Sequence, residues 1–176
     1  MIIFDLDCLA DDSHRRHFID PKHPKNLEIT NRCLLTIDKN GGCESNHQIN
    51  NFIPDYKAYY EACDKDEQID FVASVFQDLS DKCREIEVWS SRCESVRKKT
   101  ENWLWDRCLN DYGVKMRPID DNRPAEELFK RWVDERIDDM GNQLISDIDF
   151  AFSSNPEVIA IFRRLGIFVF DCKQGD

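Results

Sequence analysis

The sequence contains no long hydrophobic run. No apolar stretch approaches the roughly 20 residues that a membrane-spanning helix needs, so we expect no membrane association. The first apolar run is short and leads directly into acidic residues. It lacks the basic flank and the small-residue cleavage site of a signal peptide. These absences predict a cytoplasmic protein.

Several common motifs are also missing. The eight cysteines include no Cys-x-x-Cys pair, which favours reduced thiols over a disulfide framework or a compact zinc site. No segment matches Gly-x-x-x-x-Gly-Lys-[Ser/Thr], so a P-loop kinase is not expected. We find no repeat, low-complexity segment or linker, and 176 residues suit a single domain spanning 1–176.

The chain is short of positive charge. It has 24 Lys and Arg against 35 Asp and Glu, and its formal net charge is -11. A field of that sign repels a long phosphate backbone, so an extended nucleic-acid footprint is not expected. A few local arginines could still hold a nucleotide or a short nucleic-acid end. The composition does not indicate an oligomeric state.

Short apolar runs alternate with segments of helical spacing. Helices are predicted at 55–63, 68–79, 95–109, 124–137 and 156–165. Strands are predicted at 1–4, 85–88, 115–119, 144–152 and 167–170. This alternation predicts an α/β fold with a parallel sheet covered on both faces. Residues 20–54, rich in turn-forming residues, are predicted to form a flap or small cap insertion.

The stretch from Met1 to Asp7 is the most informative. Four apolar residues lead into Asp5-Leu6-Asp7, which is typical of a buried strand ending in two acids. A period of two points both acidic side chains the same way, at the sheet edge where open α/β folds bind ligands. Two close carboxylates need a shared proton or a cation, for which Mg²⁺ is well suited. Alone, the pattern is more typical of acidic residues that cap a strand and begin a turn.

Further motifs follow in a defined order. They are Ser13-His14-Arg15, Trp89-Ser90-Ser91-Arg92, Thr100-Glu101-Asn102-Trp103-Leu104, Met116-Arg117-Pro118, the helix bearing Lys130, and Phe162-Arg163-Arg164-Leu165-Gly166-Ile167. Together with Phe4-Asp5-Leu6-Asp7, they resemble the haloacid dehalogenase (HAD) superfamily. More narrowly, they resemble the 3′-phosphatase domain of phage polynucleotide kinase and its stand-alone phage relatives. The resemblance implies a three-layer, Rossmann-like HAD fold with a mainly parallel sheet, and a location in the host cytosol if the protein is phage-encoded.

The resemblance also implies catalytic roles. Asp5 would attack phosphorus and form an aspartyl-phosphate, and Asp7 would protonate the leaving oxygen and then activate water. Ser90 would hydrogen-bond a phosphoryl oxygen, and Lys130 would neutralise charge on the transferring group. Glu126, one helical turn before Lys130, would orient that lysine, although such a pair is also an ordinary helix ion pair.

Two arginines match substrate-binding positions of the family. Arg15 and Arg92 would grip the phosphate, because the planar guanidinium fork suits phosphate geometry better than a point charge does. Each of them alone would be interpreted as a surface cation. Their order and spacing relative to the Asp-x-Asp motif favour the functional interpretation.

The metal ligands depart from the family pattern. Mg²⁺ would be held by Asp5, by the backbone carbonyl of Asp7 and by an acid after the fourth strand. Where the family carries two aspartates, this chain has Ser153 and Ser154, so Ser154 takes the place of the third ligand. A hydroxyl is neutral and binds Mg²⁺ more weakly than a carboxylate, so the metal site is expected to be weakened.

Two functions follow from this pattern. The first is a Mg²⁺-dependent phosphomonoesterase of the HAD type, acting on a nucleotide or nucleic-acid 3′-phosphate. The alternative is a catalytically impaired protein that binds a phosphorylated nucleotide or nucleic-acid end, because Ser153 and Ser154 replace the distal acids.

Overall fold

The computed structural model describes most of the chain. For residues 137–140 it describes the backbone alone. The residues described are 1–26, 52–82, 85–109, 113–140 and 148–173. Of the predicted flap at 20–54, residues 27–51 therefore lie outside the described residues, and the flap and the single-domain organisation stay predictions.

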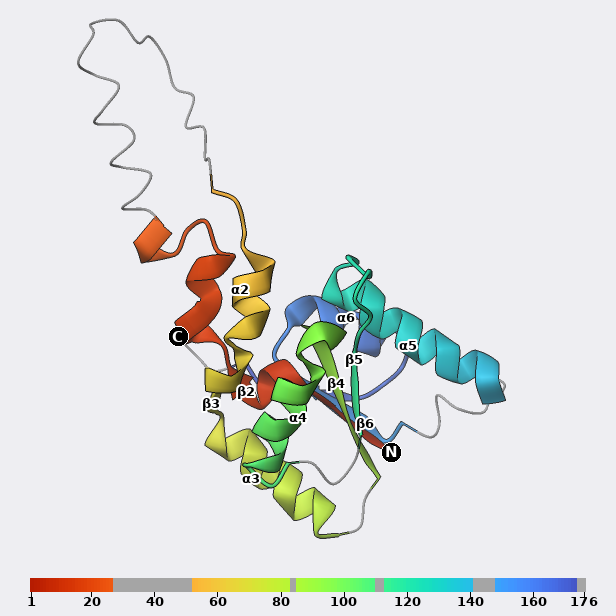
Figure 1. The fold of residues 1–176 in the computed structure, drawn as a ribbon. Coiled ribbons are helices and arrows are strands. Elements are labelled where there is room, and N and C mark those ends of the chain that lie inside the picture. The colour runs from red at the N-terminus through yellow and green to blue at the C-terminus, as the bar shows by residue number, and fades with distance from the viewer. Residues whose placement is uncertain (27–51, 83–84, 110–112, 141–147, 174–176) are drawn as a thin grey trace, which may run out of the picture.

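A five-stranded sheet forms the centre of the fold (Figure 1). Its strands are β1 (Ile2–Asp5), β4 (Ile86–Cys93), β5 (Val114–Arg117), β6 (Phe150–Ser153) and β7 (Val169–Asp171). They lie in the order β5-β4-β1-β6-β7, and each neighbouring pair is parallel. The predicted parallel sheet is confirmed, and the carboxyl ends of its strands meet at one edge.

Helices cover both faces of this sheet. The α-helices are α2 (Tyr56–Glu61), α3 (Asp70–Ser80), α4 (Arg97–Trp105), α5 (Ala125–Met140) and α6 (Pro156–Arg164). Short 3-10 helices are η1 (Leu6–Cys8), η2 (Ser13–Phe18), η4 (Cys63–Lys65) and η5 (Glu94–Val96). None of the helices in the described ranges is both long enough and apolar enough to pass through a bilayer.

The core explains the apolar run at the start of the chain. Ile2 and Phe4 belong to one buried cluster, which includes residues of α3 and α4. Ile3 belongs to a second buried cluster, which is built largely from α5 and α6. Successive residues of β1 thus face opposite layers, as the period of two requires. The result is the predicted three-layer, Rossmann-like α/β fold.

Local signals place several helix ends. The Asp55 side chain accepts a hydrogen bond from Ala58 N at the start of α2. Asn155 caps α6 by accepting from two backbone amides of its first turn, and Pro156 occupies that turn, where its missing N–H costs nothing. Gly166 follows α6 with φ +80, a conformation that glycine adopts without strain.

The boundaries of other elements differ from the prediction. β4 continues to Cys93, because its residues beyond Val88 still pair with β5, with an irregularity between Ser90 and Cys93. The predicted helix at 95–109 begins as η5, and α4 ends at Trp105. A two-stranded antiparallel sheet of β2 (Ala10–Asp11) and β3 (Glu67–Gln68) was not predicted, since two-residue strands carry no periodic signal.

Two phenylalanines on α3 test the role of the core. Phe76 is fully buried, whereas Phe71 on the same helix is 80% exposed. We expect Phe76→Ala to lower the free energy of unfolding by about 3–5 kcal/mol, because the deletion removes buried area and leaves a cavity. Phe71→Ala is the matched control and should change it by about 0.5 kcal/mol or less. Urea unfolding of both variants measures the difference, and equal effects would contradict this packing.

Candidate functional site

The strand order reverses at β1, and polar residues gather there. Asp5 lies opposite Trp89 of β4, so Ser90 is the next residue along the neighbouring strand. Phe4 lies opposite Phe152 of β6, which places Ser153 beside Asp5 on the other side. Ligands of open α/β sheets bind at such a switch point, beyond the carboxyl ends of the strands. The fold therefore brings the predicted residues Asp5 and Ser90 to one edge of the sheet. Ser153, the last residue of β6, lies at the same edge.

Asp5 is almost fully buried and hydrogen-bonded. Its side chain is bonded on both oxygens: Oδ1 accepts from Asp7 N at 3.3 Å, and Oδ2 accepts from the Ser153 hydroxyl at 2.7 Å. Burial, and secondarily the charge of Asp7, raise the pKa of Asp5 to about 8. A raised pKa favours the protonated form of the Asp5 carboxyl, which is a poorer nucleophile than the carboxylate.

Asp7 lies in η1 and is half-buried. The Ser154 hydroxyl donates a hydrogen bond to the backbone carbonyl of Asp7 at 3.1 Å. Burial raises the pKa of the Asp7 side chain, while the positive charges of Arg92 and Arg15 act in the opposite direction. Those charges indicate that both guanidinium groups lie close enough to influence Asp7.

The donors at this edge do not fit a tight Mg²⁺ site. The described residues contain no group of three or more His, Cys, Asp or Glu side chains placed to hold a metal ion. The oxygens that the resemblance assigns to Mg²⁺, on Asp5 and on the Asp7 carbonyl, already accept hydrogen bonds from Ser153 and Ser154. One carboxylate, one carbonyl and hydroxyls form a poorly charged ligand set. Mg²⁺ binding stays a prediction of the resemblance.

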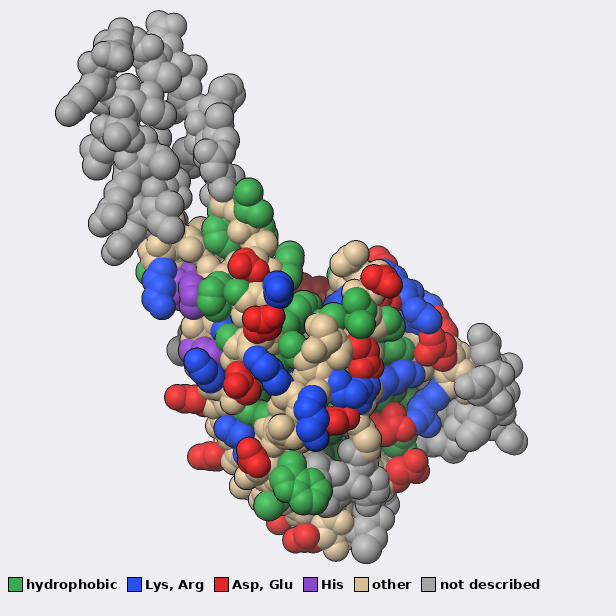
Figure 2. Space-filling view, viewed as in Figure 1, with side chains coloured by type: hydrophobic (Ala, Val, Ile, Leu, Met, Phe, Trp, Pro, Cys, Tyr) green, Lys and Arg blue, Asp and Glu red, His purple; other side chains and the backbone are tan. Residues whose placement is uncertain are grey.

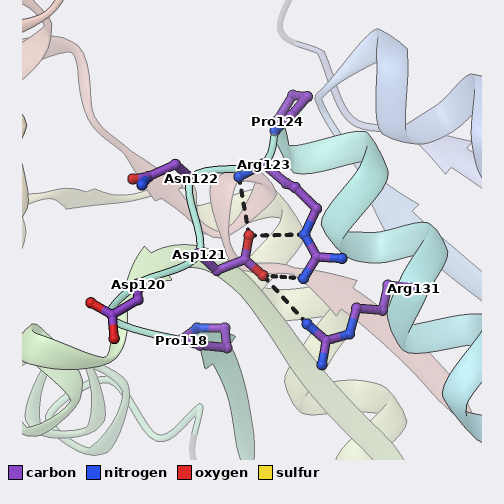
Figure 3. Close-up of a pocket in the computed structure, with 7 residues that line it drawn as sticks. All are labelled: Pro118, Asp120, Asp121, Asn122, Arg123, Pro124 and Arg131. Carbon is purple, nitrogen blue, oxygen red and sulfur yellow. Dashed lines mark hydrogen bonds and ion pairs between the residues drawn. The ribbon is translucent and has the colours of Figure 1, made fainter.

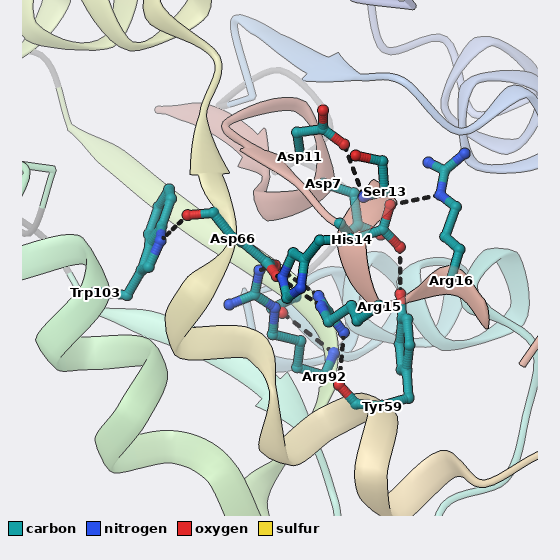
Figure 4. Close-up of polar contacts among 12 residues, drawn as sticks. Asp7, Asp11, Ser13, His14, Arg15, Arg16, Tyr59, Asp66, Arg92 and Trp103 are labelled. Atoms are coloured by element: carbon teal, nitrogen blue, oxygen red, sulfur yellow. Dashed lines mark hydrogen bonds and ion pairs between the residues drawn. The ribbon is translucent and has the colours of Figure 1, made fainter. Parts of the chain in front are cut away.

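Arg15 and Arg92 converge on a single buried carboxylate, Asp66 (Figure 4). Arg15 donates to both oxygens of Asp66, from Nε at 2.6 Å and from Nη2 at 2.7 Å. Arg92 donates from Nη2 to Asp66 Oδ2 at 2.5 Å. His14 Nε2 also lies 2.9 Å from Asp66 Oδ1. Asp66 thereby fixes the positions of both predicted substrate-binding arginines.

Neighbouring aromatic residues hold this network in place. The Trp103 indole N–H donates to the backbone carbonyl of Asp66 at 2.7 Å. The guanidinium of Arg15 lies 4.0 Å from the centre of the Tyr59 ring and donates to the Tyr59 carbonyl at 3.1 Å. The Tyr59 hydroxyl in turn donates to Asp12 at 2.5 Å. Each of the three guanidinium nitrogens of Arg15 thus has a hydrogen-bond partner, and the group also makes a cation–π contact.

Arg92 is not saturated. The residue is 1% exposed, and neither its Nε nor its Nη1 has a hydrogen-bond partner among the described residues. Leaving one buried donor unsatisfied typically costs about 1–3 kcal/mol, and more for a charged group. Because Arg92 also acts electrostatically on Asp7, its unbonded donors belong to the site. They are the donors that an anion could satisfy.

Lys130 lies on the helix that the resemblance assigned to it, and its catalytic role stays a prediction. It lies on α5 with its side chain 50% exposed, and it pairs with Asp134 at 2.5 Å, one turn later in the helix. The predicted orienting residue, Glu126, lies one turn earlier on α5. The structure thus brings together Asp5, Asp7, Ser90, Arg15 and Arg92, and it pairs Lys130 with a neighbour on its own helix.

A hollow of about 720 Å³ opens beside the site, at the end of β5 (Figure 3). Its lining includes Asp121, which lies between the guanidinium groups of Arg123 and Arg131. The hydrogen bonds from Arg123 lower the pKa of Asp121. These cations are therefore already neutralised, and the hollow offers little free positive charge to an anion. Asp5 does not line it.

Asp66 is the functional residue that sequence reasoning missed. It lies within Asp64-Lys65-Asp66-Glu67, and a charged run of this kind is usually solvent-exposed. Only the packing of η4 against α4 buries Asp66 while its neighbours Asp64, Lys65 and Glu67 stay exposed. No motif or spacing in the sequence marks it.

Comparison with solved structures shows a shared fold. A chain in the structure of the Pnkp1/Rnl/Hen1 RNA repair complex is similar with a TM-score of 0.60 and 18% identity, over 97% of this chain and 41% of that one. A chain in a structure of the Pnkp1/Rnl/Hen1 complex gives 0.56 and 25% identity, over 66% and 40%. The chain therefore spans about two fifths of their length.

A hydrolase from Streptococcus pneumoniae TIGR4 is similar with a TM-score of 0.47 and 13% identity, over 96% of this chain and 90% of that one. No family model and no curated protein sequence matches the chain. The likeness to the repair-complex chains shows that they share the overall α/β fold of this chain.

Asp66→Asn tests whether the buried carboxylate holds the two arginines. The substitution keeps the size of the side chain but removes the charge that compensates Arg15 and Arg92. Breaking a buried pair in this way typically costs about 3–5 kcal/mol, and we expect a loss of that size in the free energy of unfolding. Asp64→Asn, on an exposed residue two positions earlier in η4, is the control and should be nearly neutral. Urea unfolding distinguishes the two, and a neutral Asp66→Asn would contradict the network.

Proposed function

We propose that the chain binds a phosphomonoester group at the carboxyl edge of β1, β4 and β6. The single observation that carries this proposal is Arg92, whose buried Nε and Nη1 have no partner among the described residues. Charge-assisted hydrogen bonds from guanidinium N–H groups to phosphate oxygens are the strong ones, and Nε and Nη1 could each donate one.

The surrounding charges support an anion at this place. Two guanidinium groups, those of Arg15 and Arg92, lie around the carboxylate of Asp66. Burial raises the pKa of Asp5, which reduces the negative charge that this carboxyl sets against an anion. Ser90 follows the residue that lies opposite Asp5 in the sheet. An anionic group therefore suits the unbonded donors of Arg92 better than a neutral ligand does.

The ligand class is a nucleotide or a nucleic-acid end bearing a 3′-phosphate. Two features favour it: the motif resemblance to 3′-phosphatase domains, and the shared fold with a chain of an RNA repair complex. The net charge of -11 favours a terminal phosphate over a long internal stretch of backbone. Binding is the function that the geometry supports best, because the donors for Mg²⁺ are incomplete.

Arg92→Lys tests the binding proposal. Lysine keeps the charge beside Asp66 but removes the planar fork and its two unbonded donors. We expect the affinity for a 3′-phosphorylated nucleotide, measured by calorimetry, to fall about 10- to 100-fold, the equivalent of losing hydrogen bonds to a charged group. Arg164→Lys, on the exposed end of α6, should leave it unchanged. Equal affinity of wild-type and Arg92→Lys protein would refute a phosphate site at Arg92.

The second candidate function is Mg²⁺-dependent hydrolysis of the same phosphomonoester. It is favoured by the retained pair Asp5 and Asp7 at the end of β1. In that reaction an Asp5 oxygen would form a bond to phosphorus as the ester bond breaks, and Asp7 would protonate the leaving oxygen. Water activated by Asp7 would then cleave the aspartyl-phosphate and release inorganic phosphate. Ser153, Ser154 and the exposed Lys130 weigh against efficient turnover.

A phosphate-release assay separates binding from hydrolysis. We expect little release by the wild-type protein with Mg²⁺, and a rise of at least about tenfold in the Ser153→Asp/Ser154→Asp variant, because added carboxylates complete the ligand set. Adding Asp5→Asn to that variant should abolish the gain, since the nucleophile is lost. Omission of Mg²⁺ is the second control. Wild-type release as fast as that of the double variant would instead favour the hydrolase.

A further inference from the structure

A second hollow, of about 590 Å³, lies between α2 and the start of α4. Its lining residues are Lys57, Tyr60, Glu61, Ser95, Val96, Lys98 and Lys99. Lys99 Nζ donates to the backbone carbonyl of Glu61 at 2.5 Å and so links α4 to the end of α2. We call this hollow the α2–α4 groove. Its volume lies within the range of small-ligand sites.

The lysines of the α2–α4 groove differ from many other cations of the molecule. Arg97, Arg131 and Lys115 each pair with at least one carboxylate, and so does Lys130. For Lys57, Lys98 and Lys99, the described part of the chain contains no carboxylate partner; Glu61 offers Lys99 only its backbone oxygen. In a chain with a net charge of -11, three such lysines make a local basic site. Figure 2 shows lysine and arginine side chains, with acidic ones among them, over α2 and α4.

The α2–α4 groove adjoins the candidate phosphate site. Tyr60 follows Tyr59, whose ring and carbonyl hold Arg15. Ser95 comes three residues after Arg92, beyond the carboxyl end of β4. Tyr60 packs against the buried Cys63, Val96 and Met116, which sets one side of its ring into the wall of the groove. The groove is thus built from α2, which carries the Tyr59 contact to Arg15, and from residues that follow β4, which carries Arg92.

We propose that the α2–α4 groove binds the nucleotide units next to the terminal phosphate, so that the ligand is a single-stranded nucleic acid rather than a free nucleotide. This inference rests on the proposed function and adds a subsite to it. The ammonium groups of Lys57, Lys98 and Lys99 contact internucleotide phosphates. Tyr60 supplies an aromatic face near the bases, the combination that sequence-independent single-strand binding uses. The site is short, as the acidic charge of the whole chain requires.

The test compares two ligands and two variants. The ligands are a 3′-phosphorylated mononucleotide and a short 3′-phosphorylated oligonucleotide. The groove variant is Lys57→Gln/Lys98→Gln/Lys99→Gln, which keeps aliphatic stems and removes three charges. The control is Lys82→Gln/Arg163→Gln/Arg164→Gln, which removes three charges from exposed residues that follow α3 and end α6, away from the carboxyl edge. Affinities are measured by calorimetry at two salt concentrations.

We expect the wild-type protein to bind the oligonucleotide about tenfold or more tightly than the mononucleotide. The groove variant should lose that preference while still binding the mononucleotide normally, and the control should retain it. The slope of log affinity against log salt should also become shallower by about 0.7 for each phosphate that the lysines no longer neutralise.

Three other outcomes would contradict the proposed subsite in the α2–α4 groove. Equal wild-type affinity for both ligands leaves the phosphate site standing and removes the groove from it. An equal loss in the groove variant and in the control means that net charge alone, rather than the groove, attracts the oligonucleotide. Failure of both ligands to bind overturns the proposed function itself, and with it this inference.

Discussion

The buried carboxylate of Asp66 is the interaction on which the site depends. Arg15 and Arg92 come from segments on opposite sides of the 20–54 region, and both donate to Asp66, which lies in neither segment. Taking three charged groups out of water is costly unless their hydrogen bonds are made. Arg15 is fully bonded, whereas Arg92 keeps two donors free. The network therefore also fixes the position of Arg92, whose Nε and Nη1 have no hydrogen-bond partner among the described residues.

At the same edge, serine hydroxyls stand where the resemblance places metal-binding carboxylates. Ser153 and Ser154 place hydroxyl donors against the Asp5 carboxyl and the Asp7 carbonyl. Hydrogen bonds occupy there the oxygens that the resemblance assigns to a divalent ion. Burial raises the pKa of Asp5 to about 8, and the Ser153 hydroxyl offsets only part of that rise. The raised pKa of Asp5 and the occupied oxygens are the two features on which the proposal of binding over transfer rests.

Much of the fold and part of the site could be predicted from the sequence. Both faces of β1 are buried, so its apolar run was a direct signal of a central strand, and the alternation of elements indicated the parallel sheet. Asp5 and Ser90 were predictable because strand ends of a parallel sheet share an edge. The pairing of Lys130 with Asp134 was not, because several acids lie one turn from that lysine and only side-chain placement selects among them.

The sequence by itself determined which layers form and which strand ends carry polar groups, since periodicity and order along the chain decide both. Only the tertiary structure decided which of the many acids becomes the buried partner of two arginines. Asp66 resembles its charged neighbours in sequence, and its role arises from packing between η4 and α4. Burial is a property of the assembled chain, and it is burial that makes this carboxylate the shared partner of Arg15 and Arg92.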